Sequence, residues 1–209
     1  MPTPERAVVE RKAQLRRAVR TSRRHRRDLD PDGHARAASG DALAAATLAW
    51  LRDRSREVGH PLTVTAYASW PTEPPTEALV TALRGSGHTV LLPITHPLPD
   101  RTLDWYAAGA GPHQPWGVDA ISRADLVLAP GLLVDATGTR LGQGGGYYDT
   151  VLAHLPAGVP VCVILWDDEL TADLLPRDAH DRPVNGVLRP GFGLTWLGLG
   201  STERLTPID

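Results

Sequence analysis

Two near-continuous apolar runs restrict the fold of this chain more than any other feature. They are DLVLAP at 125–130 and GVPVCVILW at 158–166. A strand with one face in water alternates apolar and polar residues, whereas a strand covered on both faces is apolar along its length. Both runs are therefore expected to be strands buried between two layers of helices. The segment between them ends in an apolar pattern with helical spacing, which predicts a parallel crossover.

The remainder of the chain alternates helical and strand patterns in the same way. Helices are expected at 5–28 and within 34–57. The predicted strands are 62–68, 88–93, 102–108 and, as the last one, 182–190. A short helix between the first two strands makes 62–93 a βαβ-like unit. The predicted fold is α/β: a three-layer α/β/α architecture with a mostly parallel central sheet, Rossmann-like, preceded by N-terminal helices.

One domain is expected over residues 1–209, with a basic helix at 1–30 and a loosely ordered, glycine-rich tail at 191–209. The net charge of the whole chain is −2, but residues 1–30 carry a net +6. Such a segment can bind nucleic acid or an anionic small ligand, although most often it is a solvated helix face. No aromatic residue lies within the arginine-rich part, 11–27, which disfavours nucleic-acid binding.

We expect no secretory signal, because the N-terminal residues lack an apolar segment, and no membrane span, because no apolar run is long enough to cross a membrane. Cys162, the only cysteine, cannot form an internal disulfide and is expected to be a small core residue. We therefore expect a cytoplasmic monomer that binds neither a membrane nor nucleic acid.

Lys12, the only lysine in the chain, lies on the apolar stripe of the 5–28 helix. At about 100° per residue, that stripe is formed by Val8, Leu15 and Val19. Arg16 and Arg23 lie at its edge. A lysine that only confers solubility would lie opposite the stripe, so Lys12 is expected where the helix meets the body of the protein. The alternative is a lysine at a packed edge that extends its charge to water.

The stretch RLGQGGGYYD runs from Arg140 to Asp149 and precedes a predicted helix that continues through Leu155. It is not a Walker A motif, and Tyr147 replaces the third glycine of a dinucleotide-binding motif. Glycines before a helix allow backbone N–H groups to converge on an anion. Arg140 can add a bidentate contact to phosphate, and Asp149 can hold Mg²⁺ beside it. The alternative is a tight glycine turn without a ligand.

The block LVLAPGLLVDATGTRLGQGGGYYD at 126–149 resembles the signature of the 5-formyltetrahydrofolate cyclo-ligase family, also called methenyltetrahydrofolate synthetases. The matching positions are Pro130, Gly131, Asp135, Gly138, Arg140, Leu141, Gly142, Gly144, Gly146, Tyr147, Tyr148 and Asp149. Three further blocks similar to those of the family occur in the expected order, from Lys12 to Arg16, from Glu73 to Thr76 and from Pro176 to Asp181. The resemblance therefore covers nearly the whole chain.

This resemblance implies ATP- and Mg²⁺-dependent cyclisation of 5-formyltetrahydrofolate to 5,10-methenyltetrahydrofolate. In the family reaction, the formyl oxygen attacks the γ-phosphate, N10 of the folate attacks the resulting carbon, and phosphate leaves. By resemblance, ATP is bound by Lys12, Arg16, Arg140, Leu141, Gly142, Gln143, Gly144, Gly145, Gly146, Tyr147 and Tyr148. The implied folate-binding residues are Trp70, Glu73 and Tyr148, and the implied Mg²⁺ ligands are Asp149 and Asp181. The implied catalytic residues are Lys12, Arg140 and Tyr148.

Several positions differ from the family pattern. Gln143 replaces an arginine or tyrosine that is frequent there, and relative to members with the arginine this chain has one cation fewer near the phosphates. Glu169 replaces a glutamine, Asn185 replaces an aspartate, and Pro75 replaces an acidic or polar residue. His180 is expected to position the neighbouring aspartate. These differences leave open a relative that binds nucleotide or folate without turnover, or that acts on another substrate.

Overall fold

The structure is a computed structural model that describes residues 4–97, 100–177 and 181–198. Its centre is a seven-stranded sheet with the order β10-β9-β7-β4-β1-β2-β3. These strands are β1 (Thr63–Thr65), β2 (Thr89–Thr95), β3 (Leu103–Ala107), β4 (Leu126–Pro130), β7 (Val161–Ile164), β9 (Gly186–Arg189) and β10 (Gly193–Trp196). The five inner strands are mutually parallel, whereas β3 and β10 are antiparallel edges. The predicted mostly parallel sheet is therefore confirmed.

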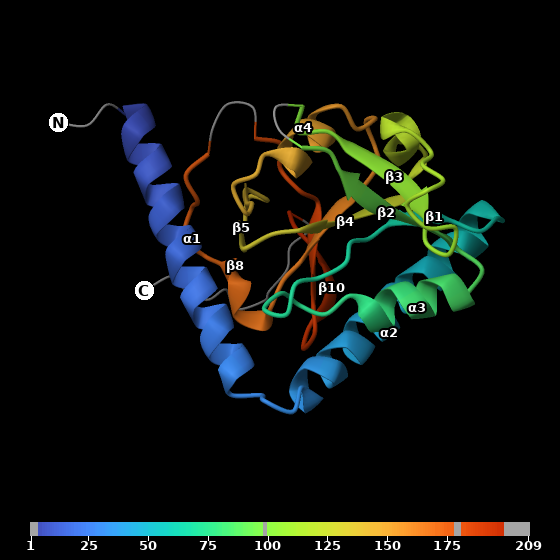
Figure 1. Cartoon of the computed structure of the whole chain (residues 1–209), viewed down its shortest axis with the longest axis horizontal. Helices are drawn as coiled ribbons and strands as arrows, with labels where there is room; N and C mark the ends of the chain where they lie inside the picture. Colours follow the sequence, from blue (N-terminus) through green and yellow to red (C-terminus); the bar gives the residue numbers. More distant parts are fainter. Residues whose placement is uncertain (1–3, 98–99, 178–180, 199–209) are drawn as a thin grey trace.

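Helices cover both faces of this sheet, as the two apolar runs predicted (Figure 1). The helices α2 (His34–Val58) and α3 (Glu77–Gly85) pack on one face, and α4 (Tyr147–Ala153) and the 3₁₀ helix η1 (Val118–Arg123) pack on the other. Alternate residues of β4 enter the two cores: Leu126 and Leu128 join the first, and Val127 and Ala129 join the second. Cys162 is buried in the first core.

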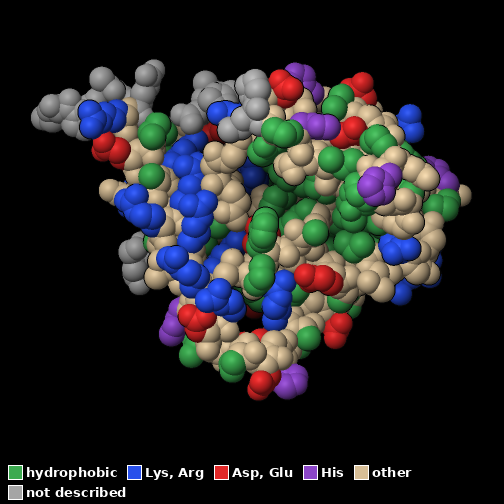
Figure 2. Space-filling model, in the orientation of Figure 1, with side chains coloured by type: hydrophobic (Ala, Val, Ile, Leu, Met, Phe, Trp, Pro, Cys, Tyr) green, Lys and Arg blue, Asp and Glu red, His purple; other side chains and the backbone are tan. Residues whose placement is uncertain are grey.

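The helix α1 (Pro4–Asp28) packs against a second, smaller sheet that the sequence did not predict. That sheet consists of β6 (Arg140–Leu141), β5 (Leu133–Asp135) and β8 (Leu170–Thr171), the last following the 3₁₀ turn η2 (Asp167–Glu169). Leu15 and Val19 of α1 are buried against Leu133 and Leu141 of this sheet. The predicted apolar stripe thus attaches α1 to the body, and Figure 2 shows basic side chains gathered along the helix.

Two predictions about the C-terminal part were wrong. The strand β9 is not the last, because Gly193–Trp196 continues the sheet as β10, paired antiparallel with β9. The residues from 191 to 198 are consequently not a loose tail, and 199–209 lie outside the described residues.

The predicted helix after the glycines ends at Ala153, two residues before Leu155. None of the described helices is both long and apolar enough to cross a membrane.

Candidate active site

A cavity of about 370 Å³ opens where the inner parallel strands end. Tyr67 and Ala68 follow β1, Pro93 and Thr95 belong to the end of β2, and Pro130 ends β4. The chain passes from β1 to β2 on one side of β1 and returns with β4 on the other side. Ligands of open α/β sheets bind at such a topological switch point, outside the carboxyl ends of the strands. The rest of the wall consists of Trp70, Glu73, Leu103, Arg140 and 142–149.

The glycine-rich stretch forms one wall of this cavity, and arginines pack directly against its backbone. A Cβ atom on Gly142 would lie 2.9 Å from Nη1 of Arg140, and one on Gly146 would lie 3.2 Å from Nη1 of Arg101. Gly144 and Gly146 also have φ values of 98° and 80°, a region that residues with a Cβ rarely adopt. Backbone conformation therefore favours glycine at Gly144 and Gly146, whereas a Cβ at Gly142 would only displace the flexible end of the Arg140 side chain.

The helix α1 holds the same stretch through two further arginines. Arg16 Nε donates to the carbonyl oxygen of Gly142 at 2.9 Å, and Arg20 Nη2 donates to the carbonyl oxygen of Gln143 at 2.7 Å. Arg16 is thus brought to the glycine-rich stretch, where the family resemblance places ATP, whereas Arg20 was not among the predicted site residues. The contacts fix the stretch between α1 and the cavity.

Each predicted metal ligand is paired with a predicted phosphate-binding cation. Lys12 Nζ lies 2.7 Å from Asp181 Oδ2, and the guanidinium of Arg140 donates to the carboxylate of Asp149. Lys12 is 9% exposed, so it lies on the inward stripe as predicted and does not extend to water. The predicted partner of Asp181, His180, lies outside the described residues.

The described residues contain no cluster of three or more His, Cys, Asp or Glu side chains that could hold a metal ion. Mg²⁺ bound to a nucleotide needs only one or two carboxylates, because phosphate oxygens and water complete its shell. Asp149 lies on the cavity wall with a side chain that is 41% exposed, so its carboxylate is accessible. The residues present therefore fit Mg²⁺ that arrives with a nucleotide.

Glu73 and Tyr148 also line this cavity. Glu73 is 3% exposed, and its carboxylate accepts hydrogen bonds of 2.9 Å from the backbone N–H of Trp70 and from Gln143 Nε2. The Tyr148 hydroxyl is buried without a hydrogen-bond partner among the described residues. Burial raises the pKa of Tyr148; Arg140 opposes this rise and Glu73 adds to it. Trp70 is 74% exposed beside the cavity, and nothing described covers its ring.

Residues 8–190 match the family model described as the 5-formyltetrahydrofolate cyclo-ligase family. The chain belongs to this family. A 5-formyltetrahydrofolate cyclo-ligase of Mycolicibacterium smegmatis is 35% identical over 204 residues, which cover 89% of this chain and 97% of the relative. The enzyme of the same name from Escherichia coli K12 is 28% identical over 147 residues, covering 64% and 81%.

Two solved structures show the same fold. A 5,10-methenyltetrahydrofolate synthetase from Mycoplasma pneumoniae superposes with a TM-score of 0.66 at 18% identity, over 84% of this chain and 96% of the other. A protein of the same name from Aquifex aeolicus superposes with a TM-score of 0.58 at 20% identity, over 92% and 96%.

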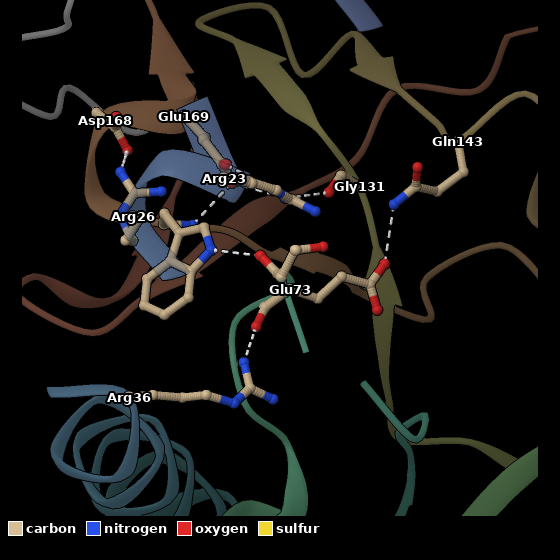
Figure 3. A network of polar contacts seen from close by, with 10 residues as sticks. Arg23, Arg26, Arg36, Glu73, Gly131, Gln143, Asp168 and Glu169 are labelled. Atoms are coloured by element: carbon tan, nitrogen blue, oxygen red, sulfur yellow. Dashed lines mark hydrogen bonds and ion pairs between the residues drawn. The ribbon is translucent and has the colours of Figure 1, made fainter. Parts of the chain in front are cut away.

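One departure of this cyclo-ligase family member from the family signature has a structural explanation. Glu169, in the position of a glutamine, forms a buried bidentate pair with Arg23 at 2.7 and 2.8 Å (Figure 3). Burial raises the pKa of Glu169, against the effect of Arg23. Burial alone would lower the pKa of Arg23, but hydrogen bonding and charge interaction with Glu169 raise it. Arg23 also donates to the carbonyl oxygen of Gly131, which joins α1 to the end of β4.

Sequence reasoning missed several groups that surround this site. Arg101, from the loop between β2 and β3, reaches Gly146 and is the only residue besides glycine with a positive φ in the described part of the chain. Arg20, on α1, and Tyr67, after β1, are likewise remote in sequence from the glycine-rich stretch. A basic residue in a loop carries no periodic signal, so the pattern of the chain could not have located Arg101.

A larger cavity of about 630 Å³ is lined in part by Pro71 and Thr72, from the same loop that supplies Trp70 and Glu73 to the smaller cavity. Several arginines line it, but acidic side chains already pair with them: Arg26 with Asp168, and Arg23 with Glu169. Its charges are thus largely neutralised within the chain. The smaller cavity, which contains the glycine-rich wall and lies at the carboxyl ends of the inner strands, is the better candidate for the active site.

Proposed function

We propose that this protein is an ATP- and Mg²⁺-dependent enzyme that converts 5-formyltetrahydrofolate to 5,10-methenyltetrahydrofolate, ADP and phosphate in the cytoplasm. The observation that carries the proposal is one cavity that combines the glycine-rich wall with Arg140, the Glu73 carboxylate and the unpartnered hydroxyl of Tyr148. Family membership supports the same reaction. All the side chains in this assignment belong to one chain, which is compatible with a monomer.

The reaction makes two demands that the described residues suit. Attack of the formyl oxygen on the γ-phosphate requires cations that hold the triphosphate, a role we assign to Lys12, Arg16 and Arg140. Mg²⁺ held by Asp149 and Asp181 would neutralise further charge on the phosphates. N10 then forms a bond to the formyl carbon, and the formyl oxygen leaves with the phosphate.

The folate is assigned to the side of the cavity that contains Glu73. A carboxylate accepts about four hydrogen bonds, and two are already accepted from within the described chain. The remaining lone pairs suit the N–H groups of a reduced pterin. The Tyr148 hydroxyl can donate to the same ligand, and the exposed ring of Trp70 can stack on it.

The proposal is tested by mixing purified protein, MgATP and 5-formyltetrahydrofolate and recording methenyltetrahydrofolate absorbance. We expect an absorbance rise that requires ATP and falls at least tenfold in Lys12→Ala, since a buried phosphate-binding cation would be lost. Arg11→Ala, which removes an exposed neighbouring cation of α1, is the matched control and should retain the wild-type rate. Absence of any ATP-dependent signal at micromolar protein, with folate still bound in calorimetry, would instead support a relative that binds without turnover.

A further inference from the structure

We propose that Gln143 is a positioning residue of the folate side of the site. Through its side-chain amide it orients the Glu73 carboxylate at the cavity wall and joins it to Arg20 of α1. This inference rests on the proposed function and differs from the sequence prediction, which assigned Gln143 to ATP together with the rest of the glycine-rich stretch.

The two ends of the Gln143 amide make different contacts. Its Nε2 donates to Glu73 Oε1 at 2.9 Å, and its Oε1 accepts from Arg20 Nη2 at 3.2 Å. The same Arg20 nitrogen donates to the backbone oxygen of Gln143 at 2.7 Å. Figure 3 shows the amide pointing at the Glu73 carboxylate. An uncharged amide therefore lies between a cation on α1 and an anion in the cavity.

Only a side chain that both donates and accepts can make this connection. A carboxylate such as that of Glu73 only accepts hydrogen bonds, and a guanidinium such as that of Arg20 only donates them. An arginine at position 143 could pair with Glu73 but would repel Arg20, and a glutamate would do the reverse. The glutamine, which departs from the residues frequent in the family, is thus matched to its two neighbours.

The hydrogen bond from Gln143 also determines which acceptor sites of the Glu73 carboxylate are open to a ligand. Its other oxygen is held by the backbone N–H of Trp70 at 2.9 Å, and its backbone oxygen accepts from Arg36. Within the described residues no charged group donates to the carboxylate. Gln143 therefore fixes the rotation of this carboxylate without neutralising its charge, and the acceptor sites that remain are available to the folate.

Because Gln143 is exposed and lies outside the buried cores, its replacement should leave the fold intact. The test compares Gln143→Ala, Gln143→Glu and Arg20→Ala with wild type, measuring KM for 5-formyltetrahydrofolate and for ATP, folate affinity by calorimetry, and the midpoint of thermal unfolding. Gln14→Ala, which removes an exposed glutamine of α1 that contacts none of these groups, is the matched control.

We expect Gln143→Ala to raise KM for the folate about tenfold, with KM for ATP and the unfolding midpoint nearly unchanged. Gln143→Glu should raise it further, because two carboxylates then face each other. Arg20→Ala should have a smaller effect, which should shrink but not vanish in the Gln143→Ala background, because Arg20 also donates to the backbone oxygen of residue 143. An unchanged KM for the folate, a rise confined to ATP, an equal rise for both, or an additive double variant would each overturn the inference.

The two proposals fail differently. If wild type binds folate but does not turn it over, the proposed reaction is wrong, while weaker folate binding by Gln143→Ala still supports the positioning role. If wild type is active and Gln143→Ala is indistinguishable from it, only the positioning role is wrong. If wild type binds no folate, both are overturned, because no ligand remains for Glu73 to receive.

Discussion

Replacing Glu169 with glutamine restores the residue frequent in the family, yet we predict that it destabilises this protein. Glu169 and Arg23 have side chains only 4% and 2% exposed, and two hydrogen bonds join them. Glu169→Gln keeps the shape of the side chain but leaves the guanidinium without its counter-charge. One nitrogen of that guanidinium, Nη1, is already buried without a partner among the described residues.

The expected loss follows from the burial of this pair. Removing one partner of a buried ion pair costs about 3–5 kcal/mol, and the amide introduced by Glu169→Gln still has an oxygen that can accept one of the bonds, so we expect about 3 kcal/mol. For a chain of this length that loss lowers the thermal midpoint by about 6–12 °C. Arg23→Leu combined with Glu169→Gln should recover most of the loss, because no unpaired charge remains in the interior.

Scanning calorimetry and urea denaturation of the two single variants and the double variant form a double-mutant cycle. Arg23→Leu alone should recover stability as the pH falls, because the raised pKa of an unpaired, buried Glu169 lets the folded state bind a proton before the unfolded state does. A Glu169→Gln midpoint within about 2 °C of wild type would refute the reasoning, as would single-variant losses that simply add in the double variant.

Three further predictions concern the site and the pH dependence of stability. Asp149→Asn should lower kcat/KM at least tenfold, and a near wild-type rate would remove its assigned role. Because the Asp149 side chain is 41% exposed, loss of its pair with Arg140 should lower the unfolding midpoint less than Glu169→Gln does. Tyr148→Phe should not reduce stability, since the hydroxyl is unpartnered, but should weaken folate binding several-fold in calorimetry. Burial lowers the pKa of His88, against the effect of Asp125, and its Nδ1 accepts from Leu62 N–H. The unfolded state therefore takes up the proton first, so stability should fall as the pH drops below about 6.5, and less so in His88→Asn; equal slopes would contradict this.

The larger elements could be predicted because each repeats a local pattern. The helix α1 is buried on one face, which gives its sequence an apolar stripe. The strands β4 and β7 are buried on both faces, which makes their sequences apolar throughout. The strands β5, β6 and β8 have only two or three residues, too few for a period to appear. The strand β10 lies in a glycine-rich segment, and only pairing with β9 makes it a strand.

The residues that line the candidate cavity could be predicted where one continuous stretch supplies them, and not where distant segments meet. The glycines, Arg140 and Asp149 form one block, and the structure places that block in the cavity wall. The contact from Gln143 to Glu73 spans 70 residues, and the pair of Arg23 with Glu169 spans 146. Such contacts depend on how α1 and the loops pack, which no local pattern encodes.

In the proposed reaction, ATP cleavage is coupled to ring closure of the folate. The most direct measurement records phosphate release and methenyltetrahydrofolate absorbance in the same reaction of wild-type protein with MgATP and 5-formyltetrahydrofolate. We predict about one phosphate per methenyltetrahydrofolate, and neither product when ATP or the folate is omitted. Phosphate release without ring closure, or ring closure without ATP, would contradict the account.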